Sequence, residues 1–140
     1  VHGVHLGDDA LLKLRNAGAT VVTCPRSNEW VGAGLPRLSH FYGCGLPVAI
    51  GTDSLASTGS LNMFDELAAL RRIAPDVSAA GLLESATHQG ALALGYGDEF
   101  GTLAPGKRAA LVAVETPPDV GDVEEYLVSG VPASSIRRAA

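Results

Sequence analysis

Polar side chains follow three short apolar segments of the sequence, at or near the point where each segment ends. The first segment carries His2 and His5, the second is followed by Arg26, Ser27 and Asn28, and the third by Asp53 and Ser54. Histidine and aspartate side chains from neighbouring strands can share a divalent metal ion such as Zn²⁺, and the aspartate can also accept a proton from a metal-bound water. The pattern therefore predicts a site at which these groups converge.

Each group also has an interpretation without chemistry. Asp53 comes after Gly51 and Thr52 and can cap a following turn or helix. Ser27 and Asn28 can hydrogen-bond to the backbone of their own loop, although binding residues often lie on loops shaped by such bonds. The residues alone leave these interpretations open.

The histidines differ in what their surroundings predict. His2 and His5 are three residues apart, so on an extended strand their side chains point to opposite faces and only one can face a site. A single histidine of this kind can also be structural. His40 and His88 lie inside helical patterns, and we expect both to be structural.

Three strands must position the polar groups, at residues 1–6, 20–24 and 47–50. A helix is expected over residues 10–17, ended by Gly18, and a brief one over residues 35–43 with Pro36 in its first turn. Residues 25–34, PRSNEWVGAG, are rich in turn residues and are predicted to form a loop.

Further elements follow the third strand. Apolar residues at helical spacing predict a helix that begins near Leu61 and ends before Pro75, and Ser78 starts another that breaks near Gly90. Residues 109–114 read as a strand, and residues 122–130 as a short acidic helix or strand.

Strands that alternate with helices at this spacing predict βαβ units and a parallel α/β sheet. A doubly wound sheet would usually show a glycine-rich phosphate turn after its first strand, and neither G-x-G-x-x-G nor a Walker loop occurs in the sequence. We therefore favour part of a (β/α)₈ barrel, in which active-site residues collect at the C-terminal ends of the strands.

The composition is that of a folded domain. The 140 residues are 46% hydrophobic with a formal charge of −5, and the Lys and Arg residues form no basic stripe, so nucleic acid is not expected as a partner. No apolar run reaches the ~20 residues of a membrane span, and no signal-peptide layout is present, so we expect a cytoplasmic protein without a membrane partner. Cys24 and Cys44 are expected to be reduced packing residues. The missing initiator Met and the strand-like end suggest a piece of a longer protein.

Five stretches, in order, carry a family resemblance: VHGVHL, CPRSN, GTDSLAS, ATHQGALALG and GTLAPGKRAAL. Together they resemble the C-terminal half of the amidohydrolase superfamily. The nearest match is the branch that holds S-adenosylhomocysteine and methylthioadenosine deaminases, guanine deaminase, aminofutalosine deaminase and triazine chlorohydrolases.

The resemblance implies a fold and a division of the chain. In that family a metal-dependent (β/α)₈ TIM barrel is joined to a small β-sandwich. Residues 1–95 would supply barrel strands six to eight with their helices, and residues 96–140 the beginning of the return to the sandwich.

The resemblance also implies roles for individual residues. Asp53 matches the aspartate after strand eight that binds the metal and accepts the proton of the attacking water. His2 matches the strand-six histidine that assists at the substrate, while His5 would pack outside. Arg26, Ser27, Asn28 and Ser54 would face a small-molecule substrate, and the divalent metal would be Zn²⁺, with Fe²⁺ or Mn²⁺ as alternatives.

The sequence departs from the family pattern in several places. The H-x-H pair of strand one, and the histidine of strand five with its nearby glutamate, have no counterpart in the 140 residues. Thr58-Gly59 stands where relatives often show Asn-Asn or Asn-Asp, and Ala110 where they usually carry Asp. Asp53 is thus the only expected metal ligand in the chain.

These observations predict a parent enzyme of the metal-dependent hydrolase class, a deaminase of a purine-like or nucleoside-like substrate. The alternatives are a chlorohydrolase or cyclic-amide hydrolase of the same superfamily, or an inactive partial chain. With one expected metal ligand, the chain by itself is expected to be inactive. A half-barrel also leaves strand edges unpaired, so the chain is expected to aggregate or form a homo-oligomer, which light scattering would test.

Overall fold

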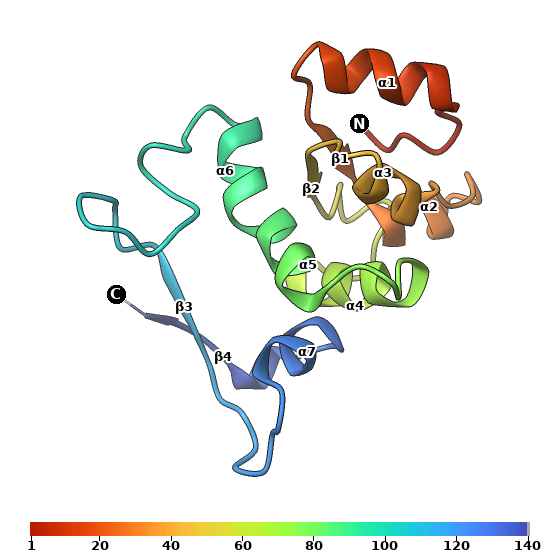
Figure 1. Ribbon diagram of the computed structural model, residues 1–140. Coiled ribbons are helices and arrows are strands. Elements are labelled where there is room, and N and C mark those ends of the chain that lie inside the picture. Colours follow the sequence, from red (N-terminus) through yellow and green to blue (C-terminus); the bar gives the residue numbers. More distant parts are fainter. Residues whose placement is uncertain (140) are drawn as a thin grey trace.

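The computed structural model describes residues 1–139, and it has a mixed α/β architecture. At its centre two parallel strands pair, β1 (Val21–Thr23) and β2 (Val48–Ile50), with Val21 opposite Val48 and Thr23 opposite Ile50. Helices pack around this pair (Figure 1). The predicted alternation of strands and helices is confirmed here, because a parallel pair requires a crossover of this kind.

Three helices accompany this pair: α1 (Asp8–Asn16) precedes β1, while α2 (Pro25–Trp30) and α3 (Leu38–Gly43) lie in the crossover between β1 and β2. α1 carries acidic residues in its first turn and basic residues in its last, which suits the helix dipole. The chain leaves α1 through Gly18, whose φ of 65° lies in the left-handed region, as the sequence predicted.

The strand predicted over residues 1–6 is wrong. This segment turns at Val4 and His5, and both His2 and Gly3 have positive φ values, 68° and 69°. A side chain at Gly3 would meet Leu6, Phe41 and Val21 at 3.2–3.3 Å, so close packing shapes the segment as much as its apolar pattern does. It still lies beside β1, because the His2 backbone N–H donates to the Val22 carbonyl (2.7 Å).

The loop predicted over residues 25–34 is also wrong in its first part. Residues 25–30 form α2, with Pro25 at its start, where a missing N–H costs nothing. Turn-forming residues at Ser27 and Asn28 misled the prediction, because both side chains are buried and bonded to distant parts of the chain.

Three helices follow β2: α4 (Met63–Ile73), α5 (Ala79–Ala86) and α6 (His88–Ala93). Asn62 caps α4 by accepting the Phe64 N–H, and Ser78 caps α5 by accepting the Gly81 N–H. The break predicted near Gly90 falls instead at Thr87, whose hydroxyl donates back to the Leu83 carbonyl (2.8 Å).

The core lies between β1, β2 and the helices. Its largest fully buried apolar side chains are Phe41, Leu11, Leu38, Leu70 and Leu82. Cys24 is buried and both cysteines are free, as predicted. No helix among residues 1–139 is both long and apolar enough to cross a bilayer.

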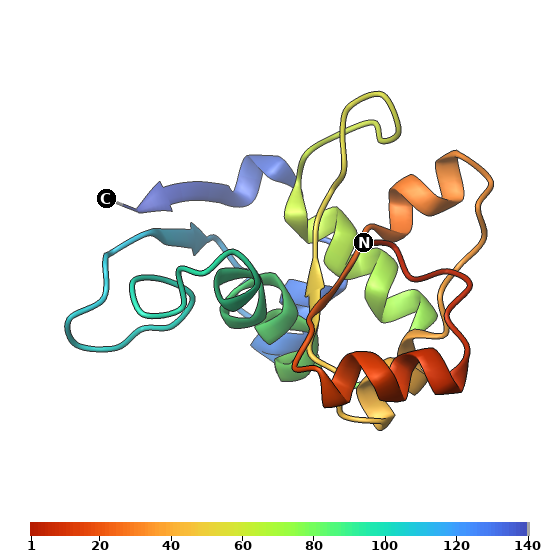
Figure 2. The same cartoon turned by 90° about the horizontal axis from the view of Figure 1, so that it is seen from above.

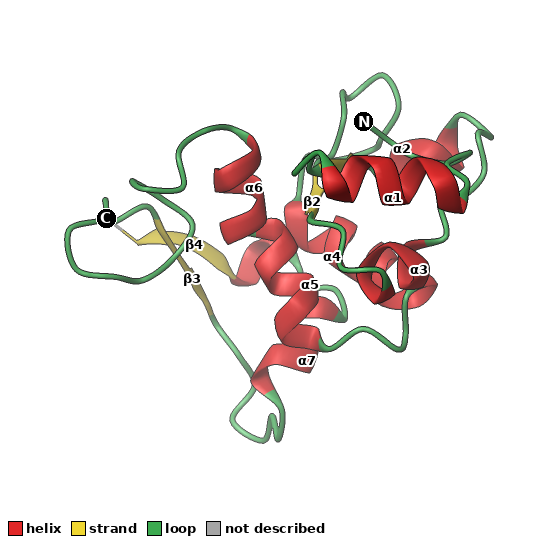
Figure 3. Ribbon diagram, turned by 45° about the horizontal axis from the view of Figure 1, so that its top comes forward, coloured by secondary structure: helices red, strands yellow, loops and turns green. Residues whose placement is uncertain are grey.

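The remaining chain, from residue 96, builds a separate strand pair. β3 (Leu111–Val114) pairs antiparallel with β4 (Ile136–Ala139), and α7 (Val123–Val128) and the short 3₁₀ helix η1 (Ala133–Ser135) connect them. Figures 1 and 2 show this pair projecting from the helices, and Figure 3 shows α7 beside α5. The strand predicted at 109–114 is confirmed, and residues 122–130 take the helical alternative.

Candidate active site

A pocket of about 510 Å³ opens at the C-terminal ends of β1 and β2. Its walls come from residues 1–6, from α2 and the turn after it, and from the segment after β2. The residues after the first segment are Ser27, Asn28, Val31, Ala33, Asp53 and Ser57. The predicted convergence of polar groups therefore exists for most of the expected residues.

Asp53 reaches the pocket through an unusual backbone conformation. The Gly51 N–H continues the β2 ladder by donating to the Thr23 carbonyl (3.0 Å), and two residues later Asp53 has a φ of 62°, in the left-handed region. Few non-glycine residues adopt this conformation, although aspartate tolerates it better than most. The backbone turn, together with the strand end, sets where the carboxylate lies.

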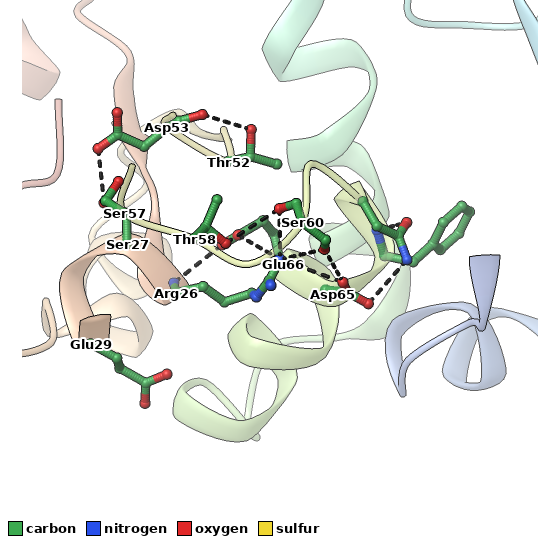
Figure 4. Close-up of polar contacts among 12 residues, drawn as sticks. Arg26, Ser27, Glu29, Thr52, Asp53, Ser57, Thr58, Ser60, Asp65 and Glu66 are labelled. Atoms are coloured by element: carbon green, nitrogen blue, oxygen red, sulfur yellow. Dashed lines mark hydrogen bonds and ion pairs between the residues drawn. The ribbon is translucent and has the colours of Figure 1, made fainter. Parts of the chain in front are cut away.

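The Asp53 carboxylate is held by two donors. Oδ2 accepts the Ser27 hydroxyl (2.8 Å), which Figure 4 draws, and Oδ1 accepts the Ser54 N–H (2.9 Å). The Ser27 hydroxyl, and then the Ser54 N–H, hold the pKa of Asp53 below its usual value of 3.8, because both stabilise the charged form. The hydrogen bond from the Ser54 N–H also agrees with the interpretation of Asp53 as a turn residue. Asp53 therefore both stabilises its turn and presents an ionised carboxylate to the pocket.

His2 lies against this carboxylate. Its Nδ1 is 2.8 Å from the Asn28 side-chain oxygen, and its Nε2 is 3.8 Å from Asp53 Oδ2. Because an amide oxygen only accepts, the His2 Nδ1 carries the hydrogen in this contact. Asn28 thereby orients the imidazole with Nε2 toward Asp53.

His5 does not behave as the strand argument predicted. Both histidines line the pocket, and His5 is exposed. His2 and His5 were expected to point to opposite faces of an extended strand. Residues 4–5 form a turn instead, so both side chains can face the same pocket.

Arg26 and Ser54 were expected at the substrate, and the structure places their side chains elsewhere. The Arg26 guanidinium contacts Ser60, Asp65 and Glu66, beside the start of α4 (Figure 4). The Ser54 hydroxyl accepts the Ala56 N–H (3.2 Å) within its own turn. Neither residue lines the pocket.

Ser57 is a pocket residue that the sequence reasoning missed. Its hydroxyl is 2.8 Å from the Ser27 hydroxyl, so Ser57, Ser27 and Asp53 form a short hydrogen-bonded chain. The three-residue spacing of Ser54 and Ser57 could have indicated a turn that brings Ser57 back toward Asp53. In the structure the Ser57 N–H closes this turn by donating to the Ser54 carbonyl (3.0 Å).

The donors in this pocket suit one side of a metal site. Each Asp53 oxygen accepts one hydrogen bond and keeps a further lone pair, and histidine with carboxylate is a ligand pair that Zn²⁺ accepts. Within residues 1–139, no group of three or more His, Cys, Asp or Glu side chains is arranged to hold a metal ion. Asp53 therefore fits as one ligand of a site that needs others.

Similar proteins share this fold and much of this sequence. The chain is 38% identical over 121 residues to 5-methylthioadenosine/S-adenosylhomocysteine deaminase of Acetivibrio thermocellus, an alignment of 81% of the chain and 28% of that protein. The crystal structure of an adenosine deaminase from Xanthomonas campestris with bound zinc superposes with a TM-score of 0.91 at 30% identity, over 96% of the chain and 33% of that protein. Guanine deaminase of E. coli gives a TM-score of 0.80 at 28% identity, over 95% and 35%.

The chain thus spans about a third or less of the length of these proteins. Residues 1–137 match the family model described as "Amidohydrolase family", which confirms the resemblance carried by the five motifs. This chain belongs to the amidohydrolase family, which has a TIM-barrel fold and hydrolytic activity.

Proposed function

We propose that this chain is the C-terminal part of a metal-dependent aminohydrolase that removes an amino group from a purine-like or nucleoside-like substrate. Three similar proteins are named as deaminases of such compounds, and one of them contains zinc. The observation that carries the proposal is the Asp53 carboxylate, ionised and held at the end of a buried parallel strand beside His2. In a barrel, that is where catalytic groups lie.

The proposed architecture follows from the same strands. β1 and β2 would correspond to barrel strands seven and eight. Residues 1–6, which turn beside β1 without forming a strand, would occupy the place of strand six, and the backbone bond from His2 to Val22 supports this assignment. Residues 1–95 would form the barrel portion. Residues 96–140 would return toward a composite β-sandwich, and the antiparallel β3–β4 pair supports this division.

A divalent metal, with Zn²⁺ the best match to these ligands, would lower the pKa of a coordinated water when bound. Asp53 would be one of its ligands, and the others would come from outside this chain. The Asp53 carboxylate would accept the proton of the attacking water as oxygen bonds to the ring carbon. Ser27 would hold Asp53 Oδ2 in place during that transfer.

His2 would act on the substrate side. Asn28 fixes its Nδ1, so Nε2 is free to contact the ring or the departing nitrogen, where charge develops. The carbon–nitrogen bond would break as the amine takes up the proton that Asp53 accepted from the water, and ammonia and the oxo product would leave. Val31 and Ala33 provide an apolar wall of the pocket that suits a planar base.

Asp53→Asn in the complete enzyme tests the proposal. The change removes both a ligand charge and the base, so we expect ammonia release from adenine, guanine and their nucleosides to fall about a thousandfold, with less zinc bound per subunit. Asp119→Asn, at an exposed turn before α7, is the matched control and should leave both quantities unchanged. Activity retained within about tenfold in Asp53→Asn would contradict the role of Asp53.

A further inference from the structure

Helix α2 carries two of the pocket residues but lacks a cap of its own. It has only six residues, and its N-cap residue, Cys24, makes no side-chain bond to the free N–H groups of the first turn. Short helices in water are marginal without tertiary contacts. The position of Ser27 and Asn28 therefore depends on what anchors α2 from outside.

The anchor is a buried carboxylate on another helix. Glu66, in α4, is 0% exposed and lies next to the core residue Leu67. Its Oε2 accepts the Arg26 backbone N–H (3.3 Å), and its Oε1 accepts from the Arg26 guanidinium (3.4 Å). Glu66 thus supplies the acceptor that the α2 N-cap does not, and its negative charge near this helix end is favourable.

Burial makes this arrangement costly unless the pair is well formed. Removal from water raises the pKa of Glu66, and the contacts from Arg26 oppose that shift. A buried carboxylate that lost its partner would be strongly destabilised.

Arg26 extends the anchor to the segment after β2. Its Nη1 donates to the Ser60 carbonyl and hydroxyl, both at 3.3 Å, and lies 3.5 Å from Asp65 Oδ2 (Figure 4). One side chain therefore joins the start of α2, the start of α4 and the end of the segment that carries Asp53 and Ser57.

The next two residues of α2 make the contacts inside the pocket. Ser27 bonds Asp53 and Ser57, and Asn28 bonds His2, each at 2.8 Å. The side-chain nitrogen of Asn28 is buried without a partner among the described residues, so His2 is the side-chain contact that orients it. A shift of α2 would move the partners of Asp53 and His2 together.

We propose that Glu66 is a positioning residue: through Arg26 it fixes α2, so that Ser27 and Asn28 hold Asp53 and His2 in reactive geometry. The effect on turnover rests on the proposed function, whereas the effect on α2 does not. Misplacement of catalytic groups by about 1 Å can cost ~100-fold in rate. Loss of the Glu66–Arg26 anchor is therefore expected to lower kcat more than it changes KM, because Asp53 and His2 act in the chemical step.

The chain contains a matched control. Glu29, near the other end of α2, pairs with Arg72 of α4 at 2.6 Å, so the same two helices are joined a second time. This pair is 41% and 58% exposed at its side chains, and an exposed pair contributes about 1 kcal/mol or less. Arg72→Gln should therefore leave α2 in place.

The experiment compares three variants of the complete enzyme. In Glu66→Gln an acceptor remains for the Arg26 N–H, and we expect kcat to fall about three- to tenfold. In the double variant Arg26→Met/Glu66→Leu the charges are replaced by apolar groups, which often preserves stability. We expect its melting temperature within about 3 °C of the parent, its KM within about threefold, and its kcat lowered by about tenfold or more. Arg72→Gln should match the parent in all three quantities.

Hydrogen exchange of the segment over residues 25–31 gives a measurement that needs no turnover. The double variant should exchange this segment about tenfold faster than the parent, and Arg72→Gln should not. A double variant with parental kcat, or with parental exchange in this segment, would overturn the positioning role. If the unmodified complete enzyme deaminates no purine-like compound, the proposed function fails. Faster exchange of residues 25–31 in the double variant would still support the role of Glu66 and Arg26 in anchoring α2.

Discussion

Strands β2 and β3 have similar compositions and opposite surroundings. Val48, Ala49 and Ile50 of β2 are all buried, because helices pack around the β1–β2 pair. Leu111 and Val112 of β3 are 37% and 59% exposed, although β3 is as apolar as β2. Apolar sequence therefore predicted both strands, and only the packing of helices distinguished a core sheet from a peripheral one.

This difference also separates the functional parts of the chain. Every side chain that lines the pocket comes from residues 1–57. The tail joins the rest through α7 and the residues just after it. Val128 at the end of α7 and Val131 beyond it are buried, and Glu125 of α7 pairs with Arg71 at 2.7 Å. Substitutions that destabilise the core should therefore disturb the pocket, whereas substitutions that destabilise the tail should not.

The largest effect is expected from Phe41→Ala. Phe41 is fully buried and supports Gly3, next to His2, so its loss should cost about 3–5 kcal/mol and lower the melting temperature by about 10 °C. Thermal unfolding of the purified chain at one protein concentration measures this. Val112→Ala, on the exposed strand β3, is the control. A fall in its melting temperature as large as that of Phe41→Ala would contradict the distinction between the core sheet and the peripheral strand pair.

Val128→Ala tests the joint between the two regions. It removes two buried methyl groups of α7, which should cost about 2 kcal/mol. Limited proteolysis should then cut the segment after residue 95 faster while residues 20–74 stay protected. Val123→Ala changes an exposed position of the same helix, and equal proteolysis in both variants would show that α7 does not attach the tail.

The smallest effect is expected from Asp8→Asn, at the start of α1. The hydrogen bond and charge of Arg37 hold the pKa of Asp8 below its usual 3.8. The folded state thus binds fewer protons than the unfolded state, so this stabilisation is present above pH 3.8 and is lost as pH falls through the folded pKa.

The melting temperatures of the parent and Asp8→Asn should accordingly differ above pH 3.8 and converge as the pH falls below it. Glu115→Gln is the control in the tail, where Glu115 and Arg137 are 3.7 Å apart and exposed. A gap between parent and Asp8→Asn that widens at low pH would refute the assignment.

Local signals in the sequence predicted several elements correctly. The apolar run before Gly51 gave β2, and Ser78 marks a helix start whose cap the structure confirms. These predictions succeeded because strand ends and helix caps depend on neighbouring residues. The five motifs led to the family because their residue types and their order can be read from the sequence without any tertiary contact.

The errors came from segments whose conformation depends on distant contacts. Residues 25–30 read as a loop because Ser27 and Asn28 favour turns, and they form a helix held by Glu66, forty residues away from Arg26. Residues 1–6 read as a strand, and they turn at residues 4–5, where Gly3 lies too close to Val21 and Phe41 to carry a side chain. No local pattern contains either contact.

The sequence by itself determined the α/β class, the family and the candidate carboxylate Asp53, because these depend on residue types and their order. Only the tertiary structure decided which groups accompany Asp53: it brought in Ser57, kept Ser27 and Asn28, and turned Arg26 away toward Glu66. The physical reason is that a side chain's partner is set by where helices pack, and a buried charge such as Glu66 fixes that packing by requiring one specific partner.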